Sequence, residues 1–246
     1  MPQLAWWQWA LAAFSAFNVG IAKTGVPGLG ILAVPLFVLA VGDARLSAGW
    51  LLPILITADI FAVITYRKMA SARSLFSLLP WVFAGMVVGA AILRYPEHVV
   101  RPIVGGIIFC ILVLFLLRRR GIDLTPDNSA ATSGIYGTAA GVATTVANAA
   151  GPVMSIYLLT RNLPREQFVA TGAWFFFLVN LSKVPIYHWQ GLISAKSLAL
   201  DAVMIIPTLA GALLGRRVLM AMPEKVFVTS VIVLAFLATI LLFLPR

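Results

Sequence analysis

FNVGIAKTGVPGLGILAVP, the stretch from Phe17 to Pro35, is apolar but is interrupted by glycine and proline. Lys23 falls in this interruption, where a charged side chain is costly unless a function requires it. A second interrupted stretch, VANAAGPVMSIY from Val146 to Tyr157, lies in the other half of the chain. These two stretches are therefore the first places to look for a polar site in an apolar protein.

The composition is that of an integral membrane protein. Of the 246 residues, 61% are hydrophobic and 11% are charged, and the mean hydropathy is +1.00. A soluble domain could not bury so much apolar surface. The net charge of +10 comes from Lys and Arg in short loops between apolar runs, which indicates membrane topology and no nucleic-acid partner. Cys110 is the single cysteine, and no ligand cluster predicts a metal or another cofactor.

The apolar runs predict an all-α protein. Six of them are long enough to cross a bilayer as one helix, and they cover residues 46–66, 74–93, 98–117, 166–187, 197–215 and 226–245. Two further stretches, 5–41 and 131–160, are apolar but interrupted. Each of these is long for one crossing and short for two.

The chain also resembles itself at a spacing of about half its length. SARSL at Ser71 has a counterpart in SAKSL at Ser194, and the Gly85 and Gly89 pair has a counterpart in Gly211 and Gly215. Such glycine pairs indicate close helix packing. We therefore predict one transport domain over residues 1–246, made of repeat 1 (about 5–120) and repeat 2 (about 131–246), each an interrupted hairpin followed by three transmembrane helices.

The distribution of Lys and Arg predicts that the repeats are inverted. If each interrupted stretch returns to the side from which it came, the loops at 67–73, 118–130, 161–166 and 216–225 share one side and hold eleven Lys and Arg, against five on the other. The positive-inside rule favours this arrangement. Inverted repeats with broken helices are a recurring plan of secondary transporters. The count does not separate re-entrant hairpins from pairs of short crossing helices.

Lys23 is the strongest candidate for binding a ligand. The glycines around it, with Pro27, disfavour a continuous helix, and broken backbone inside a membrane is tolerated where it is buried or lines a cavity. A half-helix that begins near Gly28 would direct free N–H groups at an anion. The alternative is a lysine that extends to the membrane interface. In the second stretch Asn148, before Ala150 and Gly151, gives the matching break, and its amide can donate to an oxyanion or satisfy backbone carbonyls.

Three further polar residues lie inside apolar runs. Asn180 and Lys183 share one face of a predicted helix and could extend the anion site, although Lys183 also lies within reach of the interface. Asp59 is deep in its run and should be protonated or paired, most simply with Lys23. It is either a proton-coupling group or a structural ion pair.

Four segments resemble one family of membrane permeases, the TauE/SafE sulfite exporter family, also called the toluene sulfonate uptake permease family. They are AKTGVPGLGILAVP, ITADIFAVITYRK, ANAAGPVMSIYLL and TGAWFFFLVNLSKVPIY, in the order and spacing of that family. The resemblance implies a multi-pass permease of the bacterial inner membrane for sulfite or organosulfonates, coupled to an ion gradient. Many members carry a run of glycines where this chain has Lys23, Thr24 and Gly25.

We therefore expect a secondary transporter that moves a small oxyanion by alternating access, with an anion channel of the same fold as the alternative. An enzyme would need a nucleophile or metal constellation that the sequence lacks. The expected partners are the small anion and membrane lipids, and a homodimer stays open. The residues expected to bind substrate are Lys23, Thr24, Gly25, Gly28, Asn148, Ala150, Gly151, Asn180 and Lys183, with Asp59 as the proton-coupling residue.

Overall fold

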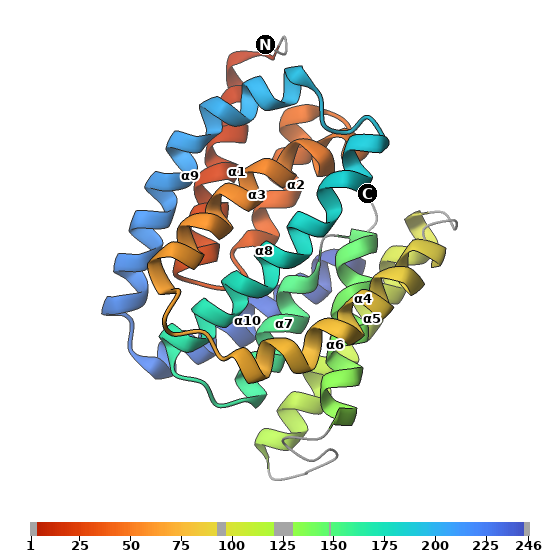
Figure 1. The fold of residues 1–246 in the computed structure, drawn as a ribbon, viewed down its shortest axis with the longest axis vertical. Coiled ribbons are helices and arrows are strands. Elements are labelled where there is room, and N and C mark those ends of the chain that lie inside the picture. Colours follow the sequence, from red (N-terminus) through yellow and green to blue (C-terminus); the bar gives the residue numbers. More distant parts are fainter. Residues whose placement is uncertain (1–3, 93–96, 121–129, 148, 244–246) are drawn as a thin grey trace. The chain divides into compact units, whose positions relative to one another are not determined.

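The computed structural model describes residues 4–92, 97–120, 130–147 and 149–243 (Figure 1). Within these residues the chain is helical and has no strand, which confirms the all-α prediction. The helices are α1 (Trp6–Thr24), α2 (Gly30–Val41), α3 (Ala44–Tyr66), α4 (Ala72–Ile92), α5 (Glu97–Arg119), α6 (Ala130–Ala147), α7 (Ala150–Thr160), α8 (Arg165–Trp189), α9 (Ala195–Ala221) and α10 (Glu224–Phe243). Each uninterrupted apolar run forms one helix, and each interrupted stretch forms two.

Several of these helices are long and apolar enough to cross a bilayer. In the described part of the chain such spans are Leu46–Tyr66, Ala72–Ala91, Arg165–Trp189 and Ala195–Ala221. They belong to α3, α4, α8 and α9. The chain is therefore a multi-pass membrane protein, as the composition predicts.

Serine side chains explain one of the repeated motifs. Ser194 precedes α9, and its hydroxyl oxygen accepts a hydrogen bond from the backbone N–H of Ser197 at 3.2 Å. Ser71 precedes α4, and its hydroxyl oxygen accepts from the backbone N–H of Ser74 at 3.3 Å. Both serines satisfy an N–H group of the first helical turn that has no partner within the helix. SARSL and SAKSL are thus helix-start signals.

The first interrupted stretch forms a helical hairpin. The Ser15 hydroxyl in α1 donates to the Ala33 carbonyl in α2 at 2.7 Å, and the Gln8 amide donates to the Ala40 carbonyl at 3.0 Å. The two helices are therefore antiparallel, and α2 ends close to the start of α1. Because α2 has only 12 residues, it is about 18 Å long, well short of a hydrocarbon core of about 30 Å. This length favours a re-entrant hairpin over two crossing helices.

The helices form two compact units, which we describe separately. Unit 1 contains Met1–Ala70 and Arg165–Pro223, and unit 2 contains Ser71–Pro164 and Glu224–Arg246. Unit 1 thus combines α1, α2 and α3 with α8 and α9, whereas unit 2 combines α4 to α7 with α10. Each unit takes helices from both predicted repeats. The duplication itself, and the inverted orientation of its halves, stay predictions.

In unit 1, α1 and α9 lie side by side and touch through glycine (Figure 1). A Cβ atom at Gly20 would collide with the backbone of Thr208 and Ala212. A Cβ atom at Gly211 would collide with the Phe17 carbonyl. Close approach of this kind lets membrane helices pack by van der Waals contact, without a hydrophobic driving force between them.

An equivalent contact occurs inside unit 2. Here α4 packs on α6, with Gly85 against the backbone of Thr138 and Gly141 against the backbone of Val82. The glycines singled out in the sequence therefore serve helix packing in both units. Their partners, Gly20 and Gly141, lie in the interrupted stretches, a pairing that spacing along the chain does not reveal.

We expect Gly211→Ala to destabilise the protein, because the added methyl group must displace backbone rather than a flexible side chain. Overpacking typically costs about 1–3 kcal/mol, and contact with backbone places this variant at the upper end. The thermal unfolding of purified protein in detergent measures the effect. Gly106→Ala is the matched control, since a Cβ there meets no atom within 4 Å. Equal stability of the two variants would contradict the close α1–α9 contact.

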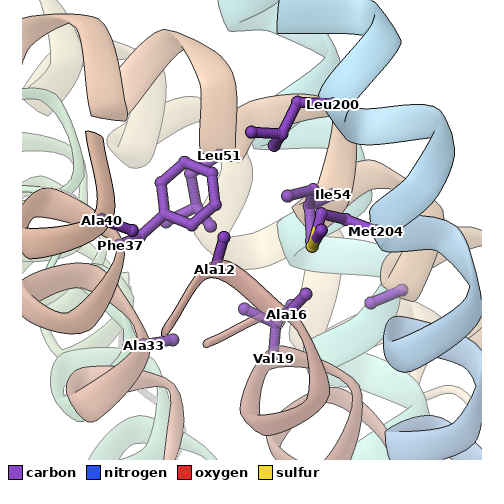
Figure 2. Packing of buried hydrophobic residues seen from close by; sticks show 11 residues of the cluster. Ala12, Ala16, Val19, Ala33, Phe37, Ala40, Leu51, Ile54, Leu200 and Met204 are labelled. Atoms are coloured by element: carbon purple, nitrogen blue, oxygen red, sulfur yellow. The ribbon is translucent and has the colours of Figure 1, made fainter. Parts of the chain in front are cut away.

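The core of unit 1 combines small residues on α1 and α2 with larger ones on α3 and α9. Figure 2 shows these side chains converging. The buried members are Ala12, Ala16, Val19, Ala33, Phe37, Ala40, Leu51, Ile54, Ala58, Leu200 and Met204. Alanines let the two hairpin helices, α1 and α2, lie close together. The larger side chains fill the space between this hairpin and the helices α3 and α9. This packing fixes the position of the hairpin tip, where Lys23 lies.

Candidate functional site

Lys23 lies on the last turn of α1 and not in the gap between helices. The helix ends at Thr24, Gly25 follows as its C-cap, and α2 begins at Gly30. Gly28, within the connection, has a φ of 105°, a conformation that favours glycine. The predicted break is therefore confirmed, but the placement of Lys23 inside it is wrong. Gly25 stops the helix only after the lysine has been fixed on a helical turn.

Lys23 forms an ion pair with Asp59. Its Nζ atom lies 2.7 Å from Asp59 Oδ1, and the Asp59 side chain is fully buried, with 0% exposed. Asn180 on α8 donates from Nδ2 to the other carboxylate oxygen, Oδ2, at 2.7 Å. Three helices, α1, α3 and α8, thus meet at one carboxylate. The pairing of Lys23 with Asp59, predicted from the cost of an isolated buried charge, is confirmed.

Two more residues of α8 complete this cluster. The Lys23 ammonium lies 3.9 Å from the ring centroid of Phe176, within the range of a cation–π contact. Lys183 is 3% exposed and interacts electrostatically with both Lys23 and Asp59. Its side chain is buried in unit 1 and does not extend outward, as the interface alternative would require. We call Lys23, Asp59, Phe176, Asn180 and Lys183 the lysine cluster.

The lysine cluster brings two ammonium groups close to one buried carboxylate. An oxyanion bound beside these ammonium groups would receive charge-assisted hydrogen bonds from them. Asn180 and backbone N–H groups at the hairpin tip could add hydrogen bonds to such a ligand.

The other predicted residues of the first stretch have structural partners. Thr24 is fully buried, and its hydroxyl donates to the Ala212 carbonyl of α9 at 2.7 Å. Its own carbonyl accepts from the Tyr66 hydroxyl at 3.0 Å. A Cβ at Gly25 would collide with Gly215. Thr24 and Gly25 therefore anchor the hairpin tip to α3 and α9, whatever else they bind.

The second interrupted stretch belongs to unit 2. Asn148 lies outside the described residues. Ala150 begins α7 and is 1% exposed, whereas a Cβ at Gly151 would meet no atom within 4 Å. Tyr136 of α6 and Tyr157 of α7 make a tilted ring contact with centroids 5.7 Å apart, and the Tyr157 hydroxyl donates to the Ser74 carbonyl at 3.0 Å. The second stretch is thus also two helices joined at a short break.

No group of three or more His, Cys, Asp or Glu side chains that could hold a metal ion gathers in the described residues. The polar groups of the lysine cluster are two ammonium groups, one amide and one carboxylate paired with an ammonium group. Groups of this kind bind ions through charge-assisted hydrogen bonds.

Comparison with protein families decides the class of the protein. The family model described as sulfite exporter TauE/SafE matches residues 12–242, nearly the whole chain. The chain belongs to the TauE/SafE family. Both interrupted stretches and the whole lysine cluster fall within the matched residues.

TauE/SafE proteins are membrane transporters rather than enzymes, so family membership makes this chain a multi-pass membrane protein of the sulfite exporter class. Comparisons with curated proteins and with solved structures gave no match. The resemblance drawn from the four sequence segments is confirmed, and it extends from α1 to the end of α10.

Sequence reasoning about this TauE/SafE protein missed three residues. Phe176 could have been suggested by its position one helical turn before Asn180. Tyr66 shows no such signal, since its bond to Thr24 depends on how α3 meets the hairpin tip. Asp201 is buried in α9, but its position close to the start of an apolar run made it resemble an acid at a helix end.

Proposed function

We propose that this TauE/SafE protein is a secondary transporter of a small sulfur oxyanion, sulfite or an organosulfonate, and that it works by alternating access. We place it in the bacterial inner membrane and couple its transport to an ion gradient. Family membership supports the class of substrate. One structural observation carries the site assignment: the Lys23 ammonium lies on the last turn of α1, next to the hairpin tip, where it pairs with buried Asp59.

In this proposal the substrate binds beside the ammonium groups of the lysine cluster. An oxyanion near Lys23 and Lys183 would receive charge-assisted hydrogen bonds from both ammonium groups. Asn180 already donates to Asp59 and would hold that carboxylate in place while the anion binds. Asp59 then acts as the internal counter-ion that keeps Lys23 stable when no substrate is present. Its role as the proton-coupling residue remains a separate proposal, tested in the Discussion.

The hairpin tip and the second stretch have supporting roles. Gly28 turns the chain before α2, whose first turn has no side-chain cap, although the Leu32 N–H already donates to the Leu29 carbonyl at 3.1 Å. The other N–H groups of this turn are proposed to donate to the anion. Asn148, Ala150 and Gly151 are proposed to supply similar donors at the start of α7. A helix start without a side-chain cap holds the ligand through backbone N–H groups, which allows a ligand to leave as well as to bind.

Transport by purified protein in proteoliposomes tests the function. We expect uptake of radiolabelled sulfite that saturates and that is stimulated by unlabelled sulfite on the opposite side. Such counterflow is a property of a carrier. Large single-channel currents without counterflow would instead identify an anion channel, and the absence of sulfite or sulfonate flux would refute the proposed substrate class.

We expect Lys183→Met to weaken anion binding while the protein stays folded. Methionine fills similar volume without charge, so the variant loses a charge-assisted bond worth about 1.5–3 kcal/mol, or about ten- to a hundredfold in affinity. The thermal shift induced by sulfite measures this loss, because a ligand of the folded state raises its stability. Lys196→Met is the matched control, since Lys196 is exposed on α9. An unchanged sulfite shift in Lys183→Met would remove Lys183 from the site.

A further inference from the structure

A second buried carboxylate lies in unit 1, away from the lysine cluster. Asp201 is on α9, inside the span Ala195–Ala221, and only 5% of it is exposed. Neither of its carboxylate oxygens has a hydrogen-bond partner among the described residues. Asp59, by contrast, has an ammonium group on one oxygen and an amide on the other. The two acids therefore differ in how their charge is compensated.

The surroundings of Asp201 are apolar. Its neighbours Leu200 and Met204 belong to the core of unit 1, where they pack with residues of α1, α2 and α3 (Figure 2). The hydroxyl groups on the same face of α9 are already used. Ser197 donates to the Ser194 carbonyl at 2.9 Å, and Thr208 donates to the Met204 carbonyl at 2.7 Å.

No charged side chain in the described residues compensates Asp201. The helices packed against α9 are α1 and α3. On α1 the titratable group is Lys23. It lies after Phe17, the residue that contacts Gly211, and its ammonium group is paired with Asp59. On α3, Asp59 and Tyr66 are bonded to the hairpin tip, and Asp43 is at the exposed start of the helix. On α9 itself, Lys196, Arg216 and Arg217 are exposed.

A bare carboxylate in such surroundings is strongly disfavoured, so a cation must accompany it. A metal ion would need several more oxygen ligands, because hard cations take about six. The described residues hold no group of three or more His, Cys, Asp or Glu side chains that would supply further ligands. A proton needs only the carboxylate itself. Protonation turns Asp201 into a neutral group that the apolar core tolerates.

We propose that Asp201 is the site that binds and releases the coupling proton of this transporter. The inference rests on the proposed function, since a coupling proton requires transport. When α9 is packed against the hairpin, Asp201 is enclosed and carries the proton. A rearrangement that lets water reach this face of α9 would release it. The end of α1 and the hairpin tip contact α9 through Gly20, Gly25 and Thr24. A movement of α9 would therefore also displace the hairpin tip and, with it, Lys23 of the lysine cluster.

Infrared spectroscopy tests the protonation of Asp201 independently of transport. A protonated carboxyl group gives a C=O stretching band that a carboxylate lacks. We expect this band in the wild-type protein reconstituted in lipid at neutral pH. It should disappear in Asp201→Asn and persist in Asp59→Asn. Absence of the band in the wild type, or its persistence in Asp201→Asn, would overturn the proposal.

Transport measurements then test the coupling. In proteoliposomes, we expect Asp201→Asn to retain sulfite counterflow exchange and to lose the accumulation that a pH gradient drives. Accumulation equal to that of the wild type would overturn the proposal. If the wild type lacked sulfite flux, the proposed function would fail, while the infrared band would still decide whether Asp201 carries a proton. Asp201→Leu keeps the test valid if the amide variant is unstable, because an apolar residue suits this core.

Discussion

Replacing Lys23 by alanine is expected to abolish sulfite transport and to lower the stability of the protein. The substitution removes the ammonium group that we propose to face the anion, and it leaves buried Asp59 with Asn180 as its remaining hydrogen-bond partner and with the electrostatic interaction of Lys183. Loss of one member of a buried ion pair typically costs about 3–5 kcal/mol. Counterflow in proteoliposomes and thermal unfolding of the purified protein measure the two effects.

The double variant Lys23→Ala with Asp59→Asn separates the two roles of Lys23. It removes both charges of the ion pair, so position 59 no longer holds a buried carboxylate that has lost its ammonium partner. We expect the thermal stability to return close to that of the wild type while transport stays absent. Recovery of transport in the double variant would mean that Lys23 serves only as the counter-ion of Asp59, and the anion site would have to lie elsewhere.

Replacing Asp59 by asparagine is expected to tighten anion binding and to slow turnover. Without the carboxylate, the anion no longer competes with Asp59 for the ammonium groups of the lysine cluster. We expect about tenfold tighter binding, equivalent to ~1.4 kcal/mol, because charge pairs in a protein interior are only weakly screened. A lower KM for sulfite together with a lower kcat would show this tighter binding, since an anion that is held more tightly leaves more slowly.

The pH dependence of Asp59→Asn distinguishes the two acids. If Asp201 carries the coupling proton, accumulation driven by a pH gradient should persist in Asp59→Asn. If that coupling is lost while Asp201→Asn keeps it, Asp59 is the proton-coupling residue, as one interpretation of the sequence holds. Asp43→Asn is the control for removal of a carboxylate from α3, because Asp43 is exposed and asparagine also caps a helix start well.

The sequence predicted the helices well for a physical reason. Apolar runs without glycine or proline clusters can cross a bilayer only as helices, because backbone groups find no water there. Their starts were predicted to within two residues, as for α9, which begins at Ala195 where the predicted run begins at 197. The break after Thr24 was equally predictable, since Gly25, Pro27 and Gly28 follow one another closely. One of the four segments that carry the family resemblance, AKTGVPGLGILAVP, contains this break.

The candidate site was only partly predictable. A lone lysine and a lone aspartate at membrane depth have few ways to be stabilised, so the pair of Lys23 with Asp59 followed from energetics. The helical position of Lys23 was missed because glycine marks where a helix stops only to within a residue or two. The contact of Lys23 with Phe176 depends on how α8 packs against α1. The hydrophobic periodicity of the sequence does not predict that packing.

The interleaving of helices bears on how the protein is made. Unit 1 needs α8 and α9, which the ribosome synthesises after α1 to α7, so the hairpin must wait for them in the lipid bilayer. Lys23 and Asp59 lie on α1 and α3, and they can neutralise each other before α8 is made. Asn180 arrives later and completes the bonding of the carboxylate. The same ion pair thus shields two charges from lipid during biogenesis, well before any substrate reaches it.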